Sequence, residues 1–519
     1  MAPLARLRRV VARARATERS RWWTTFLLAA SLSSLWLLAT PLFGAPDEPA
    51  HAVRAASVAR LDVVGDEEPE FKDRLVVEAP KSYGDAAKSI ACYVFGATIP
   101  ASCATFDDHN ELERLPTSAG RHPPAYYFVA GIPTLAVRGA LSIYLMRVVG
   151  AVITAAFVAS AVATLERLRR PRLGALAILI GATPMMFFIG GTVNPSSVEI
   201  PAALSLWMAG AVLALEAPTR VDSRLVRRVG VAAIALVLSR QLAPLWLALI
   251  AAALIAVGGT VMIRALWASR SARRWGVAVL VAAVLQCLWI LIVRPLDPSL
   301  GDKTLAHDLT TGSALKTSLG ETLNRLREMV GWFGWLDAPS PGITYMLWVI
   351  ALGALLALAL FAWHRRLLLV AGATAIAAIA APVGFETIQA HKIGFFWQGR
   401  YSMPLALGVP VLLALSAALG GARAERDLDD SMGPARGVDR VVGAVAIAVV
   451  VGQVAAFGQA LRRNTVGYNG PFDFLIHPDW SPPAPVWFLV LAYAVVVSAF
   501  AFWVASSTTT HEQATSTPG

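Results

Sequence analysis

The sequence predicts an all-α membrane protein of about twelve transmembrane helices. Of its 519 residues, 56% are hydrophobic and 15% are charged, and the mean hydropathy is +0.59. A soluble domain rarely reaches this balance, because it must cover its surface with polar groups. The apolar residues also gather in runs of about 20, the helical length that crosses the hydrocarbon layer of a bilayer. Helices are expected because isolated strands cannot satisfy their backbone groups in lipid.

Each apolar run is assigned to one span. The first member of the pair 229–240 and 243–264 is short for a span. Basic clusters flank the pair on both sides, which predicts a hairpin that turns at "SRQLAP" (239–244). The expected spans are 23–43, 141–164, 173–191, 197–216, 229–240, 243–264, 276–294, 343–363, 367–384, 403–420, 440–460 and 486–505.

The net charge of +11 does not indicate a nucleic-acid partner. Basic residues stand in short clusters between the apolar runs, which is the positive-inside pattern of cytoplasmic loops. The first span is expected to stay uncleaved, because the run is long and the cleavage pattern at its end is weak. The chain is therefore divided into a basic cytoplasmic tail at 1–22, a transmembrane domain at 23–505, and a disordered cytoplasmic tail at 506–519.

Two large loops are expected outside the cytoplasm, at about 44–140 and about 295–342. Loops of this length without a function are uncommon. The first contains "HPPAYYFVAGIPTLAV" (122–137), which is too short and too rich in proline to cross, and is expected to lie along or dip into the outer interface. Cys92 and Cys103 stand in the same loop. A disulfide is expected between them in an oxidising compartment, and the alternative is two free thiols.

Two carboxylates and a histidine directly follow the first span, in "APDEPAH" (45–51). In a structural interpretation, Asp47 caps a short helix, Glu48 favours its positive end, and Pro49 opens it. This interpretation leaves out His51, which in a helix lies about one turn beyond Asp47 on the same face. An acid at a membrane edge is partly desolvated, which suits a general base. Asp47, Glu48 and His51 are therefore the candidate catalytic residues.

A second group of polar residues lies in "FETIQAHKIGFFWQGRYSMP" (385–404), outside the membrane between two spans. Arg400 precedes a span on the outer side, against the positive-inside trend. An arginine there suits a phosphate or a carboxylate at the membrane surface, and the alternative is contact with lipid headgroups. Its neighbours Gln398 and Tyr401 are further candidates, although aromatic residues at this level are commonly interface anchors.

Further polar side chains are expected at or inside the outer edge of the membrane. Ionisable groups there are costly and are functional candidates by default, while the alternative is that they pair with one another as structural bridges. Asp337 closes "GWFGWLD" (331–337) in the second large loop and is either a site residue or a turn residue. The membrane-edge candidates are Arg147, Asn194, Glu199, Arg240 and Gln241.

Six motifs in a fixed order resemble the bacterial membrane family called domain of unknown function 2142, and more broadly the GT-C membrane glycosyltransferases. The resemblance covers the chain from Trp22 to about Trp503. The motifs are "PDEPAH", "HPPAYY", "TPMMFFIGGTVNPSSVEI", "SRQLAPLW", "GWFGWLD" and "WQGRYSMPL".

The resemblance implies a many-helix fold with a catalytic first outside loop and a sugar donor carried on a polyprenyl phosphate. Asp47 matches the acid that acts as base on the acceptor in such enzymes. Arg400 with Tyr401, and Arg147 or Arg240, would bind the departing phosphate. No cofactor is expected; a divalent metal at Asp47, Glu48 and His51 is not favoured, because three ligands within five residues need outside help. The expected substrate-binding residues are His122, Asn194, Glu199, Gln398 and Asp337.

The sequence thus predicts a glycosyltransferase at the outer face of a bacterial cytoplasmic membrane. Its expected partners are membrane lipid, a polyprenyl-phosphate sugar, and an acceptor glycan, lipid or protein of the cell envelope. The alternative is a transporter or flippase for a lipid-linked sugar. Transport needs polar groups along the middle of the membrane, whereas the expected mid-span positions are almost all Ala, Leu, Val and Gly. A structural envelope-assembly protein with a degenerate site is a third reading.

Overall fold

The computed structural model describes residues 17–68, 70, 74–108, 111–294, 309–428 and 434–507. Within them, 10 helices are long and apolar enough to cross a membrane, and a bent pair makes up to 11. The pair is α7 (Pro171–Gly181) and α8 (Pro184–Gly190), bent by 64°. The long helices are α2 (Glu18–Ala39), α6 (Gly139–Thr164), α9 (Ser196–Glu216), α11 (Ala243–Ala268), α12 (Arg270–Val293), α15 (Gly342–Ala362), α16 (Arg365–Ile393), α17 (Gly399–Ala406) with α18 (Gly408–Leu428), α19 (Pro434–Val466) and α20 (Val486–Ala505).

The expected span at 229–240 is a shorter helix that begins earlier, α10 (Ser223–Val237). Its 15 residues rise only about 22 Å, less than the ~30 Å of a hydrocarbon layer. Arg228 near its start bonds Glu18 at the start of α2, while Arg240 just beyond its end contacts Tyr401 at the opposite end of the bundle. The helix therefore carries the chain through the bundle despite its length, and the hairpin turn lies at 238–242 as predicted.

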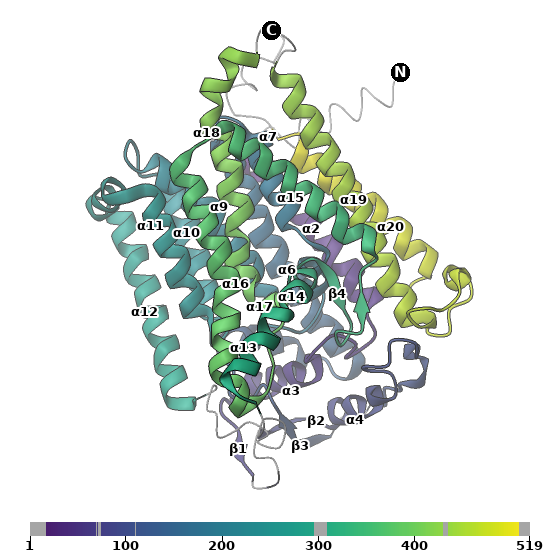
Figure 1. Ribbon diagram of the computed structural model, residues 1–519. Coiled ribbons are helices and arrows are strands. Elements are labelled where there is room, and N and C mark those ends of the chain that lie inside the picture. Colours follow the sequence, from purple (N-terminus) through teal and green to yellow (C-terminus); the bar gives the residue numbers. More distant parts are fainter. Residues whose placement is uncertain are drawn as a thin grey trace.

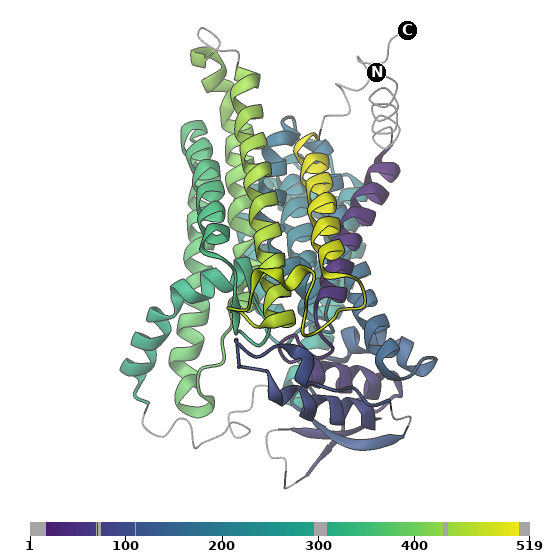
Figure 2. The same cartoon turned by 90° about the vertical axis from the view of Figure 1, so that its right-hand side faces the viewer.

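All described spans run between two ends of one helical bundle (Figure 1). Helix α2 begins and α20 ends at the same end, and the 44–140 segment lies at the other, here called the loop end (Figure 2). Helix α9 is the most buried of the 10 long helices, with 94% of its most apolar stretch buried. By contrast, α12 exposes Val277, Leu280 and Ile292 on its outer face, as a helix in contact with lipid does. The protein is a polytopic membrane protein.

The break between α7 and α8 is satisfied from within the bundle. Pro184 begins α8 and cannot donate a backbone hydrogen bond, so a continuous helix through this point is disfavoured. The carbonyl of Ala182 at the break accepts from Gln453 Nε2 at 2.7 Å, and Gln453 Oε1 accepts from the hydroxyl of Tyr493 at 2.7 Å. Trp36 Nε1 in turn donates to Tyr493 at 3.0 Å. Helix α19 thereby supplies a hydrogen bond to the break, and α20 and α2 hold Gln453 in place through Tyr493 and Trp36.

The 44–140 segment is a small mixed domain rather than a purely helical loop. A three-stranded antiparallel sheet in the order β1-β2-β3 packs on the buried helix α3, with Leu75 paired to Thr117. The disulfide predicted between Cys92 and Cys103 is present, with Cα atoms 6.3 Å apart. The elements are α3 (Glu48–Ala59), β1 (Asp66–Glu67), β2 (Leu75–Pro80), α4 (Lys81–Ser89), η1 (Ile90–Cys92), η2 (Ala101–Cys103), β3 (Leu112–Thr117), α5 (Pro124–Gly131) and η3 (Ile132–Leu135).

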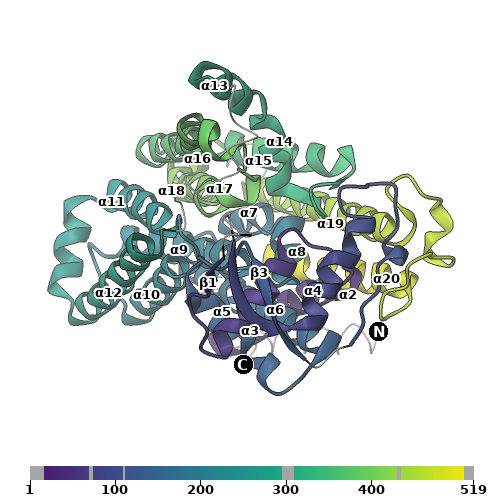
Figure 3. The same cartoon turned by 90° about the horizontal axis from the view of Figure 1, so that it is seen from below.

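The predicted interface segment 122–137 forms two short helices, α5 and η3. One face packs on α3, where a side chain at Gly131 would meet the Ala55 carbonyl oxygen at 2.0 Å, so glycine is required. The other face exposes Phe128, Ile132 and Leu135. Seen from the loop end, α3, α5 and the sheet cover the ends of α2, α6 and α8, while α10, α11 and α12 stand to one side (Figure 3).

The second large loop also lies at the loop end, and its described part begins at residue 309. It forms α13 (Thr311–Gly320), α14 (Thr322–Gly331) and a hairpin of β4 (Trp332–Phe333) and β5 (Ala338–Pro339). The two tails lie almost wholly outside the described residues, at 1–16 and 508–519. Helix α2 begins at Glu18, with Thr17 as its cap, so its first turn lies within the tail expected at 1–22.

Candidate functional site

A polar cavity of about 200 Å³ opens where the 44–140 segment meets the spans. It lies between the start of α3, the turn after β3, the turn between α10 and α11, and the start of α17. Seven of the candidates predicted from sequence line it, and they come from five separate parts of the chain. The lining residues are Asp47, His51, Ser118, Ala119, His122, Glu199, Arg240, Gln241, Leu242, Trp246, Phe396 and Tyr401.

Asp47 takes an unusual backbone conformation at the edge of this cavity. Its φ of 63° is left-handed, a region that few residues other than glycine adopt, although aspartate is among them. Asp47 occupies the N-cap position of α3, as the structural interpretation predicted, but its side chain makes no capping bond there. Its Oδ2 instead accepts from Arg400 Nη2 at 2.6 Å, and the side chain is 40% exposed. The backbone turn thus directs the carboxylate away from its own helix and toward α17.

Arg400 is held in place by the second large loop. Gly399 N donates to Glu328 Oε2 of α14 at 2.5 Å. A side chain at Gly399 would meet the Arg325 carbonyl oxygen at 2.1 Å, so only glycine allows α14 and α17 to approach this closely. The guanidinium of Arg400 is 2% exposed, and its Nε has no hydrogen-bond partner in the described part of the chain. An arginine in the first turn of a helix opposes the helix dipole, so this placement needs another reason.

Arg240 lies across the ring of Tyr401 from Arg400. The two guanidinium carbons are 4.2 Å and 5.1 Å from the Tyr401 ring centroid, within the range of cation–π attraction. Arg240 Nη1 donates to Ser196 Oγ at 2.9 Å, and its Nε is 3.9 Å from Glu199 Oε2. Arg240 therefore lines the cavity with Glu199 and Asp47. Arg400 is not part of the lining and lies buried behind Asp47 and Tyr401, which it contacts.

Two histidines that line the cavity are hydrogen-bonded to one tyrosine behind them. The Tyr127 hydroxyl is 2.8 Å from His51 Nδ1 and 3.0 Å from His122 Nδ1. Burial lowers the pKa of His51 well below its usual value, helped by the positive charges of Arg240 and Arg400. Burial, followed by His51 and Arg240, likewise lowers the pKa of His122. Both imidazoles are therefore neutral at neutral pH.

The shared hydroxyl ties the tautomers of the two histidines together. A phenol has one proton to donate, so Tyr127 donates to one Nδ1 and accepts from the other. The neutral histidine whose Nδ1 accepts from Tyr127 carries its own proton on Nε2. The neutral histidine whose Nδ1 donates to Tyr127 has an unprotonated Nε2. One histidine with a protonated Nε2 and one with a free Nε2 thus line the same cavity. Gln241 lies beside them, with its Nε2 3.4 Å from His122 Nε2.

Two predicted site residues are structural instead. Glu48 and Arg147 are both fully buried and form a bidentate pair, with Nε–Oε1 at 2.7 Å and Nη2–Oε2 at 2.6 Å. The other N–H groups of Arg147 donate to the carbonyls of Leu37, Thr40 and Pro41. No donor remains for a phosphate. The structure therefore gives Glu48 and Arg147 a structural pairing away from the cavity, in place of the catalytic and phosphate-binding roles predicted for them.

Three other candidates also lie outside the cavity lining. Asp337 pairs with Arg463 of α19 and accepts from Trp335 N at 3.1 Å, so it fixes the β4–β5 hairpin. Asn194 is buried beside the start of α9, where its Oδ1 accepts from Ser196 N at 3.0 Å. Gln398 precedes Arg400 without reaching the cavity lining. The place of these three residues along the chain predicted that they lie near the membrane edge. It does not determine which way each side chain points.

Sequence reasoning missed Tyr127, Ser118, Trp246 and Phe396. Of these four residues, only Tyr127 could have been predicted from the sequence. It stands five residues after His122, in a motif that already held a candidate site residue. Among the described residues, no three His, Cys, Asp or Glu side chains are grouped so that they could hold a metal ion. The turn of Glu48 toward Arg147 removes it from any such group with Asp47 and His51.

The fold and this cavity define a class of protein: a polytopic helical membrane protein with a polar, arginine-bearing site at one end of its bundle. Residues 31–409 match the family described as predicted membrane protein (DUF2142), and the chain belongs to that family. The matched range includes every residue that lines the cavity and ends before α19 and α20. The family's description names no activity, and no curated protein matches the chain.

Proposed function

We propose that this protein transfers a sugar from a polyprenyl-phosphate donor to a hydroxyl of a cell-envelope acceptor, at the outer face of the bacterial cytoplasmic membrane. The observation that carries the proposal is the Asp47–Arg400 contact at the edge of the cavity. It places a partly exposed carboxylate beside a buried arginine that still has unused N–H groups. A glycosyl transfer from a phosphate needs both groups, one for the nucleophile and one for the leaving group.

Asp47 has the features of a general base. Its Oδ1 makes no hydrogen bond to any residue that the structure describes, while Oδ2 is fixed by Arg400. In the proposed step, Oδ1 takes the proton of the acceptor hydroxyl as its oxygen bonds to the anomeric carbon. A positioned base of this kind contributes ~10²–10⁴-fold. A single displacement inverts the anomeric configuration.

Arg400 and Arg240 would receive the leaving group. As the bond from the anomeric carbon to the phosphate oxygen breaks, its electron pair stays on the phosphate, which departs without taking up a proton. Preorganised positive charge at that oxygen stabilises the transition state. Leu242, Trp246 and Phe396 line the same cavity at the start of α11 and just before α17, and they offer apolar contact for the first part of a lipid chain.

Sugar transfer by the purified protein in lipid tests the proposal, with a panel of polyprenyl-phosphate sugars as donors. Asp47→Asn keeps the shape of the side chain and removes the base, so transfer should fall by about 10²-fold or more. Asp66→Asn is the matched control, because Asp66 lies in the same segment and makes only an exposed pair with Arg114. Equal rates of transfer by wild type and Asp47→Asn would show that Asp47 is not the catalytic base. No turnover by either, with donor binding that is lost in Arg400→Ala, would favour transport of a lipid-linked sugar instead.

A further inference from the structure

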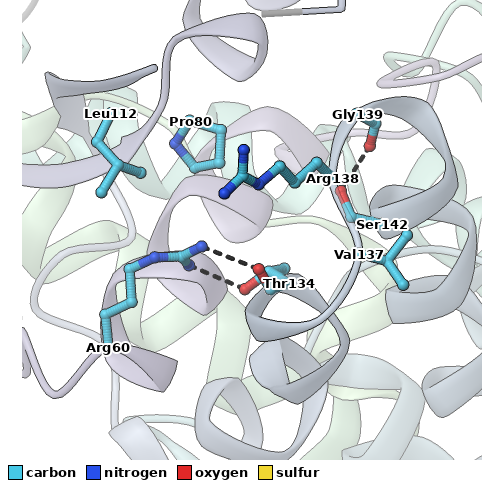
Figure 4. Close-up of a pocket in the computed structure, with 8 residues that line it drawn as sticks. All are labelled: Arg60, Pro80, Leu112, Thr134, Val137, Arg138, Gly139 and Ser142. Carbon is cyan, nitrogen blue, oxygen red and sulfur yellow. Dashed lines mark hydrogen bonds between the residues drawn. The ribbon is translucent and has the colours of Figure 1, made fainter. Parts of the chain in front are cut away.

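A second polar cavity, of about 240 Å³, lies at the far end of α3 (Figure 4). Asp47 lies at the N-terminal end of α3, and Arg60 lies at its C-terminal end. Because α3 has 12 residues, the two cavities are separated by about 18 Å. They share no lining residue. The second cavity is lined by Arg60, Pro80, Leu112, Thr134, Val137, Arg138, Gly139 and Ser142.

Two arginines reach into this cavity from opposite sides (Figure 4). Arg60 is held rigidly, because Nη1 donates to Ala56 O at 2.9 Å and Thr134 Oγ1 at 3.0 Å, and Nη2 donates to Thr134 O at 2.9 Å. Its Nε–H and one Nη2–H are left unused. Arg138 is exposed and makes no hydrogen bond or ion pair with the residues that the structure describes. The cavity thus holds one preorganised and one free guanidinium, the group that best matches a phosphate.

The residues that line this cavity show how deep it lies relative to the membrane. Gly139 is the first residue of the membrane-spanning helix α6, so Arg138 and Ser142 lie where the span ends. Apolar side chains surround them on the outside of the molecule: Leu135 is 58% exposed, Leu141 is 57% exposed and Ile132 is 50% exposed. Arginines next to exposed apolar side chains at the end of a span are the arrangement expected at the level of lipid headgroups.

We propose that this cavity binds the phosphate headgroup of an anionic membrane phospholipid. Arg60 and Arg138 would contact the phosphate, and the acyl chains would lie against Leu135 and Leu141. No side chain caps α6, so the amide groups of its first turn add partial positive charge. One acid, Asp108, has its carboxylate against Gly139, and the two arginines outweigh its charge. The bound lipid would hold the 44–140 segment on the membrane, independently of the reaction proposed at Asp47.

Native mass spectrometry of the detergent-purified full chain, titrated with phosphatidylglycerol, phosphatidylcholine or inorganic phosphate, tests this site. We expect phosphatidylglycerol to bind most tightly. Arg138→Gln should weaken its binding by about tenfold, because each charge-assisted hydrogen bond contributes about 1.5 kcal/mol or more. Lys88→Gln is the matched control, since it removes one charge from the same segment at an exposed position. It should bind as the wild type does.

Arg60→Gln also removes the contacts to Thr134, so its effect on folding is measured separately by thermal unfolding. Arg138→Gln breaks no hydrogen bond or ion pair with the described residues, and it decides the question by itself. Equal phosphatidylglycerol binding by wild type, Arg138→Gln and Lys88→Gln would overturn the proposal. Inorganic phosphate or phosphatidylcholine that binds as tightly as phosphatidylglycerol would overturn the assignment to an anionic lipid. Asp47→Asn should leave this binding unchanged, so failure here is distinguishable from failure of the proposed reaction.

Discussion

Asp47 and Arg400 are separated by 353 positions in the chain, yet Arg400 Nη2 donates to Asp47 Oδ2 at 2.6 Å. One residue stands at the start of the first extramembrane segment and the other at the start of α17. Their contact joins the mixed domain at 44–140 to the spans beside the cavity. It depends on a left-handed backbone at residue 47 and on the glycine at residue 399.

The left-handed backbone at Asp47 can be tested by comparing substitutions that all remove the carboxylate. Asn and Gly tolerate this conformation, whereas Ala meets a steric penalty of roughly 1–2 kcal/mol. Asp47→Ala should therefore lower the free energy of unfolding in mixed micelles by about 1 kcal/mol relative to Asp47→Asn and Asp47→Gly. Three equal stabilities would show that residue 47 is not left-handed in the folded protein.

The buried Glu48–Arg147 pair should be required for stability. Removal of one partner leaves an uncompensated buried charge, which costs about 3–5 kcal/mol. Glu48→Gln should therefore sharply lower the yield of folded protein and its resistance to thermal unfolding. Asp66→Asn breaks an exposed pair of the same type and should change stability by less than about 1 kcal/mol. A Glu48→Gln protein as stable as Asp66→Asn would contradict the structural role.

Tyr127→Phe removes the hydroxyl that couples His51 to His122 and keeps the ring in place. Each Nδ1 then loses its partner, which costs about 1–3 kcal/mol for a buried polar group. Sugar transfer should fall and its pH profile should shift, because neither histidine is held in one tautomer. Tyr126→Phe, on the neighbouring ring, serves as the control, since the hydroxyl that contacts His51 and His122 is that of Tyr127. An unchanged pH profile in Tyr127→Phe would count against the coupled pair.

Stability should fall as the solution becomes acidic. The pKa values of His51 and His122 are lowered in the folded protein, while an unfolded histidine titrates near about 6.5. Below that pH the unfolded chain binds more protons than the folded one, so protonation favours unfolding until the lowered folded pKa is reached. Unfolding midpoints measured from pH 7.5 to 5 should therefore decline. The decline should be shallower in His51→Gln with His122→Gln, and identical slopes would show that the carboxylates alone cause it.

Local sequence predicted most of the spans, because the free energy of placing a residue in lipid is nearly additive along a helix. Two segments depart from the pattern of one straight helix per apolar run. The segment 171–190 is bent because Pro184 interrupts its helix, and α10 is too short for a full span. The sheet at 66–117 was missed, because its strands are short and carry charges at their edges. The disulfide was predicted from compartment and spacing alone.

The candidate site was predicted only in part, and the arginines explain why. Arg147, Arg240 and Arg400 looked alike in the sequence, each an arginine near the end of an apolar run. The structure gives Arg147 a complete set of partners, while Arg240 and Arg400 flank Tyr401 at the cavity. Asp47 and Glu48 are adjacent in the chain and differ in the same way, one at the cavity and one buried against Arg147.

The sequence by itself determined that this is a helical membrane protein, where its helices lie along the chain, and which polar residues stand near their ends. Those properties follow from composition and periodicity within about 20 residues. Only the tertiary structure decided which polar groups are paired and which face a cavity. A partner such as Arg400 for Asp47 is set by how distant helices pack, and the burial that separates a structural ion pair from a reactive one exists only after they have packed.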